Sequence, residues 1–418
     1  MKYFKLILIW FLTLILIVSC DVKNKDVTQI TFWHVMGGPA GDALREIVDS
    51  FNLKNPEYKI VPISVGTYEA LSTKLMASMS NPPVISQVYE SWTNEFYNSG
   101  VLEPIENLID EDFKDQIDND FFEIFVKDNT FNGKLLSLPF NKSVPAYFYN
   151  KDIFKKFSIE KFPENWDEFI SVMKKLTVDL DKDGNLDLHG TAFNINVWMF
   201  ECRLFQYNGE LVDSNMNPLF NSEAGVKAVD IDKRIVNVDK SGYITTGYQH
   251  QDDFISKKVA VIYGSTVSLS FIEESNPGFE VGIAPVPQGD RKAVIISGTN
   301  VAIFKKATPK QKEGAIKFIK YFTSPEVQSL WSYKTGYLPV RKSSMDSELL
   351  KKRFSEYEGL KEVYLQLNSS YMEPQDRLWY LGRKYLGNAL EYAIKGNEDS
   401  KKSLDQAAKE ILKEIKEK

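Results

Sequence analysis

The stretch from Pro139 to Asp152 constrains the fold more than any other part of the chain. Two apolar segments, 136–140 and 146–149, have the composition of β-strands, and the polar residues 141–143 (Asn-Lys-Ser) separate them. Pro145 favours an extended backbone at the residue before it and removes one donor from a sheet. The stretch therefore either crosses between two lobes with its polar groups exposed, or forms a strand–turn–strand within one sheet. In the first case a ligand cleft is expected at the crossing.

Strands and helices alternate before this stretch. In chain order the expected elements are a strand at 29–35, a helix near 44–51, a strand at 58–65, a helix near 71–79 and a strand at 84–89. The apolar residues of the two helices recur every three or four positions, and the alternation is typical of a parallel α/β sheet. Ligands bind such sheets beyond the carboxyl ends of the strands, so the turn 66–68 and the pair Tyr89-Glu90 are candidate site positions. His34 is interpreted as a structural histidine.

A second α/β pattern follows the crossing. Expected helices are 151–157, one beginning at Trp166, 197–207, 222–238, one after Pro309, one from Pro325 to Gly336, and the tail 375–418 with Gly396 between two segments. Expected strands are 258–264, 279–285 and 293–304, and the last two are expected to return the chain to the first lobe. The fold class predicted is α/β.

The N-terminus has the pattern of a processing signal. Lys2 and Lys5 form a small basic region at the start of the almost continuously apolar run 4–18, which is too short for a convincing membrane span. The run ends at Leu16-Ile17-Val18-Ser19-Cys20, which resembles the lipobox of bacterial lipoproteins, with a plain secretory signal as the alternative. We therefore expect a signal peptide at 1–19, a lipid on Cys20 and a tether at 20–26. Asp21 resembles an inner-membrane retention signal, which applies only in a host with an outer membrane.

Composition limits the function classes. The net charge of −6 over 418 residues argues against a nucleic-acid binder, which would carry a basic stripe. Once Cys20 is lipidated, Cys202 is the one remaining cysteine, so no intramolecular disulfide is expected and Cys202 is predicted to be buried and inert.

Several motifs together resemble extracellular solute-binding protein family 1 of ABC importers. They are Phe32-Trp33-His34, 55–62, Gly66-Thr67-Tyr68-Glu69, Gln87-Val88-Tyr89-Glu90, the crossing 139–152 and Lys334-Thr335-Gly336-Tyr337-Leu338-Pro339. Within the family, the Gln-Val-Tyr-Glu piece and the crossing are most similar to the glycerol-3-phosphate-binding branch. The resemblance runs from about residue 28 to the C-terminus and is thin between 158 and 257.

The resemblance implies a non-enzymatic, exported binding protein with a two-lobed, periplasmic-binding-protein-like fold of type II. A hinge joins the lobes, and the ligand cleft lies between them. Lobe 1 would comprise 27–141 and 293–340, and lobe 2 would comprise 142–292 and 341–418. The implied partners are a small-molecule solute, the transmembrane subunits of an ABC permease and, through the lipid, the outer face of the cytoplasmic membrane (in the periplasm if the host has an outer membrane). The protein is expected to be a monomer.

The resemblance also implies site residues. Positions matching ligand-binding positions of the glycerol-3-phosphate branch are Tyr68, Glu90, Ser143, Ser268 (with Ser265 as the fallback), Gly298, Tyr337 and Arg383. Trp198 matches one of the family's cleft tryptophans, whereas Ile195 stands where a second one is found. This departure gives a thinner aromatic wall and a differently shaped pocket.

The chemistry of this set favours a phosphorylated polyol. A phosphate group suits a bidentate arginine with hydroxyl and backbone N–H donors, and a carboxylate such as Glu90 accepts from hydroxyl groups. Glycerol-3-phosphate or a related glycerophospho-compound is therefore the expected ligand, with a neutral sugar or oligosaccharide as the alternative. An exported glycoside hydrolase would need two facing carboxylates, and Glu90 has no obvious acidic partner in the matched set.

An acidic loop stands apart from this set. Asp179, Asp181, Asp183 and Asp187, with Gly184 at the sixth position, resemble the first half of an EF-hand calcium loop. The glutamate expected at position twelve is replaced by Gly190. The loop is therefore either a structural calcium site or an Asp-Gly turn on a solvated surface, and no other cofactor is expected.

Overall fold

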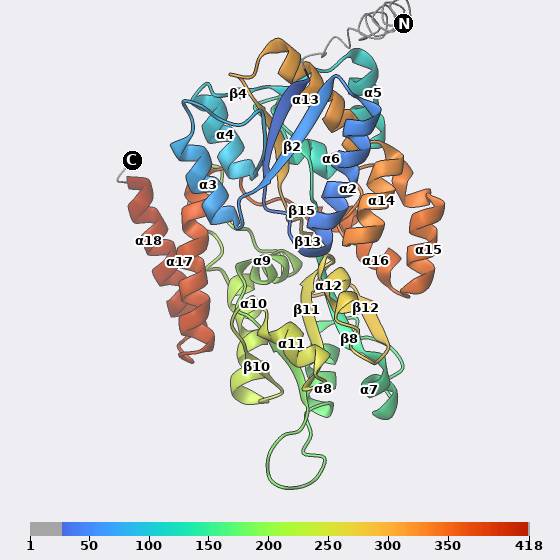
Figure 1. Cartoon of the computed structure of the whole chain (residues 1–418). Coiled ribbons are helices and arrows are strands. Elements are labelled where there is room, and N and C mark those ends of the chain that lie inside the picture. Colours follow the sequence, from blue (N-terminus) through green and yellow to red (C-terminus); the bar gives the residue numbers. More distant parts are fainter. Residues whose placement is uncertain (1–26, 417–418) are drawn as a thin grey trace, which may run out of the picture.

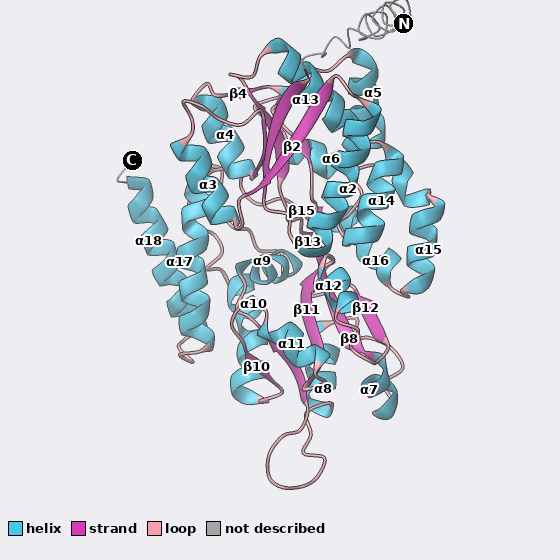
Figure 2. Ribbon diagram, in the orientation of Figure 1, coloured by secondary structure: helices cyan, strands magenta, loops and turns pink. Residues whose placement is uncertain are grey.

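A computed structural model describes residues 27–416, which form two α/β lobes around separate sheets (Figures 1 and 2). The first sheet has the order β2-β1-β3-β14-β4, with β7 also pairing with β14. Its strands are β1 (Thr28–His34), β2 (Tyr58–Ser64), β3 (Ile85–Val88), β4 (Leu102–Glu103), β7 (Leu138–Pro139) and β14 (Asn300–Phe304). Strand β1 runs parallel to β2 and β3, and β14 runs antiparallel to its neighbours. The predicted parallel start of the fold is confirmed.

The second sheet has the order β10-β9-β11-β8-β12. Its strands are β8 (Pro145–Asn150), β9 (His189–Phe193), β10 (Gly242–Ile244), β11 (Val259–Ser265) and β12 (Val281–Ala284). Two short pairs complete the sheets: β13 (Val294–Ile295) with β15 (Ser370–Tyr371), and β5 (Thr130–Phe131) with β6 (Lys134–Leu135). The prediction that 279–285 returns the chain to the first lobe was wrong, because β12 pairs with β8 of the second sheet.

Helices with one apolar face cover the first sheet. They are α2 (Gly38–Lys54), α3 (Tyr68–Ala77), α4 (Glu90–Asn98), α5 (Glu111–Asp120), α6 (Glu123–Asp128), α13 (Pro309–Phe322) and α14 (Pro325–Thr335). The predicted apolar face of α2 is buried, and Phe51 on that face meets Phe318 of α13 edge to face at 5.3 Å. Helix α14 ends at Gly336, whose φ of +76° gives the left-handed cap that the sequence predicted.

The remaining helices belong mainly to the second lobe and the C-terminal part. They are α7 (Lys151–Lys156), α8 (Trp166–Lys175), α9 (Val197–Gln206), α10 (Glu223–Lys233), α11 (Gln249–Ile255), α12 (Ser268–Glu274), α15 (Glu348–Glu356), α16 (Leu360–Leu365), α17 (Arg377–Ile394) and α18 (Ser400–Lys416). A wider π-helical turn, Arg234–Val238, continues α10. Helices α17 and α18 lie side by side and pack on α10, while α17 also touches α4 of the first lobe (Figure 1).

The segment 139–145 crosses between the two lobes, as predicted. Strand β7, at its start, belongs to the first sheet, and β8, at its end, belongs to the second. It is not a strand–turn–strand in one sheet. The chain returns beside it: Ser143 and Ser297 exchange backbone hydrogen bonds of 2.9 Å, and Leu338 N donates to Lys142 O at 2.7 Å. Three segments that are far apart in the sequence therefore meet between the lobes.

The expectation that the polar groups of the crossing are exposed was wrong. Asn141 and Lys142 are each 1% exposed. Their burial is tolerated because each has a partner: Lys142 Nζ donates to Asp128 Oδ2 at 2.6 Å, and Asn141 Oδ1 accepts from Gln87 Nε2 at 3.1 Å. Thr299 also donates to Asn141 Oδ1 from its backbone N at 3.1 Å.

The predicted strand 293–304 is divided into β13 and β14 by a bend at Gly298. This residue has a φ of +103°, and a Cβ at this position would lie 1.9 Å from the backbone oxygen of Asn141. Only glycine permits both the left-handed backbone and this approach. Gly298 therefore lets two crossing segments run in direct contact.

Candidate functional site

Two of the predicted site residues begin helices that follow parallel strands of the first sheet. Tyr68 is the first residue of α3, which follows β2, and Glu90 is the first residue of α4, which follows β3. The Thr67 hydroxyl caps α3 by accepting from Ala70 N at 3.1 Å. The structure thus places Tyr68 and Glu90 beyond the carboxyl ends of the strands, where the sequence analysis expected them.

Tyrosines from both lobes gather around Asn141. The Tyr68 hydroxyl accepts from Asn141 Nδ2 at 3.1 Å, and its ring lies 5.0 Å from that of Tyr89. Burial raises the pKa of Tyr68 and of Tyr337, and each of these hydroxyls acts on the pKa of the other. Tyr248, the residue before α11 in the second lobe, is 76% exposed and lies near enough to both to raise their pKa values further.

Glu90 lies in a largely desolvated, acidic environment. Burial raises the pKa of its carboxyl to about 8, and repulsion by Asp128 and Glu373 acts in the same direction. The Lys142 ammonium opposes the shift, but it is already bound to Asp128. Glu90 is therefore mostly uncharged at neutral pH and can donate as well as accept a hydrogen bond.

Arg383 on α17 is held by two carboxyl groups. Its Nη1 donates to both oxygens of Glu201 on α9, at 3.2 and 3.3 Å, and to Glu373 in the segment before α17. The Glu201 side chain is fully buried, which raises its pKa well above the usual value, whereas the Arg383 side chain is 30% exposed. All three contacts use Nη1, so the Nε and Nη2 donors have no partner among the described side chains.

The other predicted residues occupy different settings. Ser268 is the first residue of α12, and its hydroxyl accepts from Gln251 Nε2 at 3.2 Å. Ser143 and Gly298 lie in the paired crossing segments described above. Trp198 is 9% exposed and its Nε1 donates to Ile295 O at 2.8 Å, so most of this side chain serves the core. Ile195 packs against the helical core formed by α10, α17 and α18.

Sequence reasoning missed several polar residues of the region. Asn141 and Lys142 were noted only as part of the crossing, and Glu201, Glu373 and Asp128 were not noted at all. Glu201 and Arg383 are 182 positions apart, so no local pattern links them. The one available signal was a glutamate within the strongly apolar helix 197–207, because a buried carboxyl group requires a partner.

The acidic loop projects from the second lobe, beyond α8 (Figure 1). Carboxylate oxygens of Asp179, Asp181 and Asp187 lie within 4.8 Å of one another, whereas Asp183 does not belong to this group. The same carboxylates accept backbone N–H groups, including Lys182 N and Gly184 N on Asp179 at 2.7 and 2.9 Å. The geometry is therefore compatible with both a cation site and a hydrogen-bonded turn.

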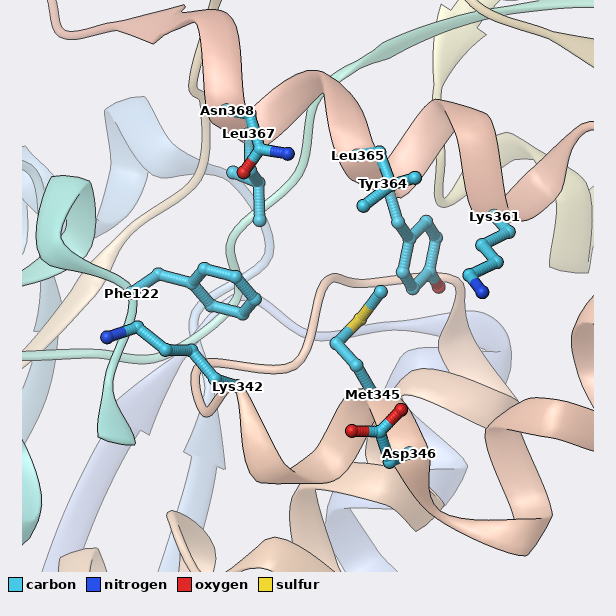
Figure 3. Close-up of a pocket in the computed structure, with 9 residues that line it drawn as sticks. All are labelled: Phe122, Lys342, Met345, Asp346, Lys361, Tyr364, Leu365, Leu367 and Asn368. Carbon is cyan, nitrogen blue, oxygen red and sulfur yellow. The ribbon is translucent and has the colours of Figure 1, made fainter. Parts of the chain in front are cut away.

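A cavity of about 240 Å³ lies away from the predicted site residues (Figure 3). Its lining residues are Phe122, Lys342, Met345, Asp346, Lys361, Tyr364, Leu365, Leu367 and Asn368. The Tyr364 hydroxyl lies 3.5 Å from the backbone oxygen of Tyr337, which is the link between this cavity and the candidate site.

Two further predictions concern single residues. Cys202 is a free, buried thiol whose pKa burial raises to about 12, as expected for a structural cysteine. His34 is buried, its pKa is lowered to about 4, and its Nδ1 accepts from Met36 N at 3.1 Å. Between residues 27 and 416, no helix combines the length and the apolar character needed to span a bilayer. Cys20 and the segments 1–19 and 20–26 lie outside the described residues.

Replacing Glu90 by Gln is expected to change how stability depends on pH. Because the pKa of Glu90 is raised from 4.5 to about 8 on folding, its stabilising protonated form is lost as pH rises through this window. The wild type should therefore lose stability relative to E90Q between pH 5 and pH 8.5, by at most about 1.4 kcal/mol per pH unit. Urea unfolding at both pH values measures this. The exposed Glu69, replaced by Gln, is the matched control, and identical pH profiles for E90Q and the wild type would contradict the assignment.

The chain is similar to proteins of known role. A family model described as bacterial extracellular solute-binding protein matches residues 46–357. The sn-glycerol-3-phosphate-binding periplasmic protein UgpB of Escherichia coli strain K12 is 30% identical over 344 residues, which is 77% of this chain and 76% of that protein. The protein of the same name from Yersinia pestis is 29% identical over 348 residues, or 78% of this chain and 77% of that one.

Solved structures share the fold. UgpB from Mycobacterium tuberculosis in complex with glycerophosphocholine has a TM-score of 0.81 at 23% identity, covering 92% of this chain and 97% of that one. Maltose-bound MalE3 of T. maritima has a TM-score of 0.79 at 21% identity, covering 92% and 99%. The family match, the relative at 30% identity and the two-lobed fold together show that the chain belongs to the bacterial extracellular solute-binding proteins of ABC transporters, which bind solutes and are not enzymes.

Proposed function

We propose that this protein captures glycerol-3-phosphate or a related glycerophospho-compound and delivers it to the permease of an ABC importer. One observation carries the proposal: Arg383 presents its free Nε and Nη2 donors in the same polar region as Glu90, Tyr68 and Tyr337. This region combines a fork for phosphate with acceptors for hydroxyl groups. The curated relatives, whose names state that they bind sn-glycerol-3-phosphate, support the same ligand class.

The proposed roles follow from the chemistry of each group. Arg383 binds the phosphate oxygens, and Glu90 binds the glycerol hydroxyls. The hydroxyls of Ser143, Ser268 and Tyr337 and the backbone of Gly298 are proposed as further donors. Tyr68 is proposed as a further ligand-binding position, and Trp198 as the apolar wall.

The proposed lobes keep the predicted boundaries. Lobe 1 comprises 27–141 and 293–340, and lobe 2 comprises 142–292 and 341–418, with the paired crossing segments as the hinge. We propose that the lobes close on the solute as a monomer, and that the solute lies between them. The contact of α17 with α4 supports this arrangement, because it brings the proposed phosphate and polyol groups to the same interlobe region.

A neutral sugar is the second candidate, and a specific observation favours it. The contacts of Arg383 with Glu201 and Glu373 balance its charge, so the region has no unpaired cation among its described side chains. A site without excess positive charge suits a neutral ligand.

Replacing Arg383 by Ala distinguishes the two candidates. A charge-assisted hydrogen bond contributes roughly 1.5–3 kcal/mol, so the affinity for a glycerophospho-compound should fall about 10- to 150-fold. Calorimetric titration of the soluble domain with glycerol-3-phosphate, glycerophosphocholine and maltose measures this. Exposed Arg45, replaced by Ala, is the control and should leave the affinities unchanged. Binding of maltose alone would overturn the proposal that the ligand is a glycerophospho-compound, and it would leave the solute-binding role intact.

We propose that Cys20 carries the lipid that anchors the protein to the outer face of the cytoplasmic membrane. The apolar run ending in Leu-Ile-Val-Ser-Cys supports this. In a cell fractionation, Cys20→Ala should move the protein from the membrane to the soluble fraction. Retention of the variant in the membrane would argue for a different anchor.

We propose a structural calcium ion in the acidic loop, bound by the carboxylates of Asp179, Asp181 and Asp187; Asp183, predicted as a fourth ligand, would need to reorient. A metal that binds only the folded state stabilises it. If calcium is present at about one hundred times its Kd, removing it with a chelator should lower the Tm by about 3 °C. Calorimetry with EDTA and with restored calcium tests this, with D181N as the variant that should not respond. An unchanged Tm would leave only the turn.

A further inference from the structure

The carboxyl group of Glu373 lies beside the proposed phosphate-binding arginine. One of its oxygens accepts from Arg383 Nη1, and the other accepts from Trp379 Nε1 at 3.2 Å. Arg383 and Trp379 lie four positions apart on α17, so both contacts hold Glu373 against one face of a single helix. The Glu373 side chain is 16% exposed. Both of its oxygens therefore accept hydrogen bonds from side chains of α17.

The guanidinium of Arg383 contacts two carboxyl groups and still has donors without a partner among the described side chains. Glu201 and Glu373 occupy Nη1, and Nε and Nη2 remain for a ligand. Lys142 does not add an unpaired positive charge, since its Nζ is bound to Asp128 in a pair that is almost fully buried. Burial raises the pKa of Glu90 to about 8 and also raises the pKa of Glu201, whose side chain is fully buried. Glu373, whose side chain is 16% exposed, is the more accessible of the two carboxyl groups that contact Arg383.

We propose that Glu373 is a specificity-determining residue that makes the site prefer singly charged phosphodiesters to doubly charged phosphomonoesters. This inference rests on the proposed function and refines its ligand class. A phosphomonoester carries about −1.5 to −2 charges at pH 7 because its second pKa is near 6, whereas a diester carries one. The second negative charge of the monoester has no cation to meet and lies close to Glu373, at a site where water screens it poorly.

A matched pair of ligands isolates this effect. Glycerol-3-phosphate and its methyl diester differ by one methyl group and one ionisable oxygen. At pH 7.5 the wild type should bind the diester about tenfold more tightly, which corresponds to about 1.4 kcal/mol. In E373Q, which keeps the shape and an acceptor oxygen for Arg383, the preference should fall to about threefold or less through a gain for the monoester. Calorimetric titration measures both affinities. E391Q, which removes an exposed charge from the same helix, should keep the wild-type ratio.

The pH dependence provides a second test that needs no variant. Between pH 7.5 and pH 5.5 the monoester gains a proton, so its affinity for the wild type should approach that of the diester. The ionisable groups around Arg383 and Glu373 are Glu201 on α9 and, at the start of α4, Tyr89 and Glu90. Asp128 at the end of α6 and Lys142 in the crossing act on Glu90. Their titration changes the charge of the site for both ligands, whereas protonation of the phosphate changes the charge of the monoester alone.

The outcomes separate this inference from the proposed function. If both ligands bind with equal affinity, or if E373Q loses both in the same proportion, Glu373 only positions Arg383 and the charge selection is overturned, while the glycerophospho-binding function stands. If neither ligand binds and maltose does, the proposed function fails and the charge selection fails with it. If E373Q does not fold, an affinity ratio for the wild type that is independent of pH still overturns the inference.

Discussion

The arrangement of the molecule depends on a buried polar network where the chain crosses between the lobes. Asn141 binds Gln87 at the end of β3 and Thr299 in the returning segment, and Lys142 binds Asp128 at the end of α6. Each group is desolvated and each has a partner, so loss of one member would leave its partner buried and unpaired, at a cost of about 3–5 kcal/mol for the ion pair. The network therefore fixes how the two sheets are joined. The positions of the residues between the lobes depend on this connection.

The positions of the candidate site residues depend on this network and on helix α17. Asn141 donates to Tyr68, which ties the tyrosines of the first lobe directly to the crossing. Helix α17 approaches from the other side, where Tyr380 meets Trp92 of α4 with ring centroids 6.5 Å apart. The position of Arg383 relative to Glu90 therefore depends on the contact between α17 and α4. A movement of the lobes that separates these helices would separate the arginine from the carboxyl group.

Local signals explain what the sequence could predict. The periodicity of α2, the left-handed cap at Gly336 and the strand ends at Tyr68 and Glu90 are each encoded within a few residues, and the structure has them where expected. The failures involve partners that are distant in the chain. The burial of Lys142 requires Asp128, the setting of Arg383 requires Glu201, and the sheet to which β12 belongs depends on its pairing with β8. Composition and spacing carry no information about such pairs.

The acidic loop shows how a protruding segment can remain independent of the site. Backbone pairing between Val178 and Leu188 closes the loop at its base, directly before β9. Inside this closure the carboxylates bind backbone groups of the same loop, such as Asp187 accepting from Leu180 N at 2.6 Å. We therefore expect sequence changes at the tip of the loop to leave the second sheet unchanged. The loop is a natural place for an inserted sequence or a reporter domain, because the strand pair at its base would isolate the addition from solute binding.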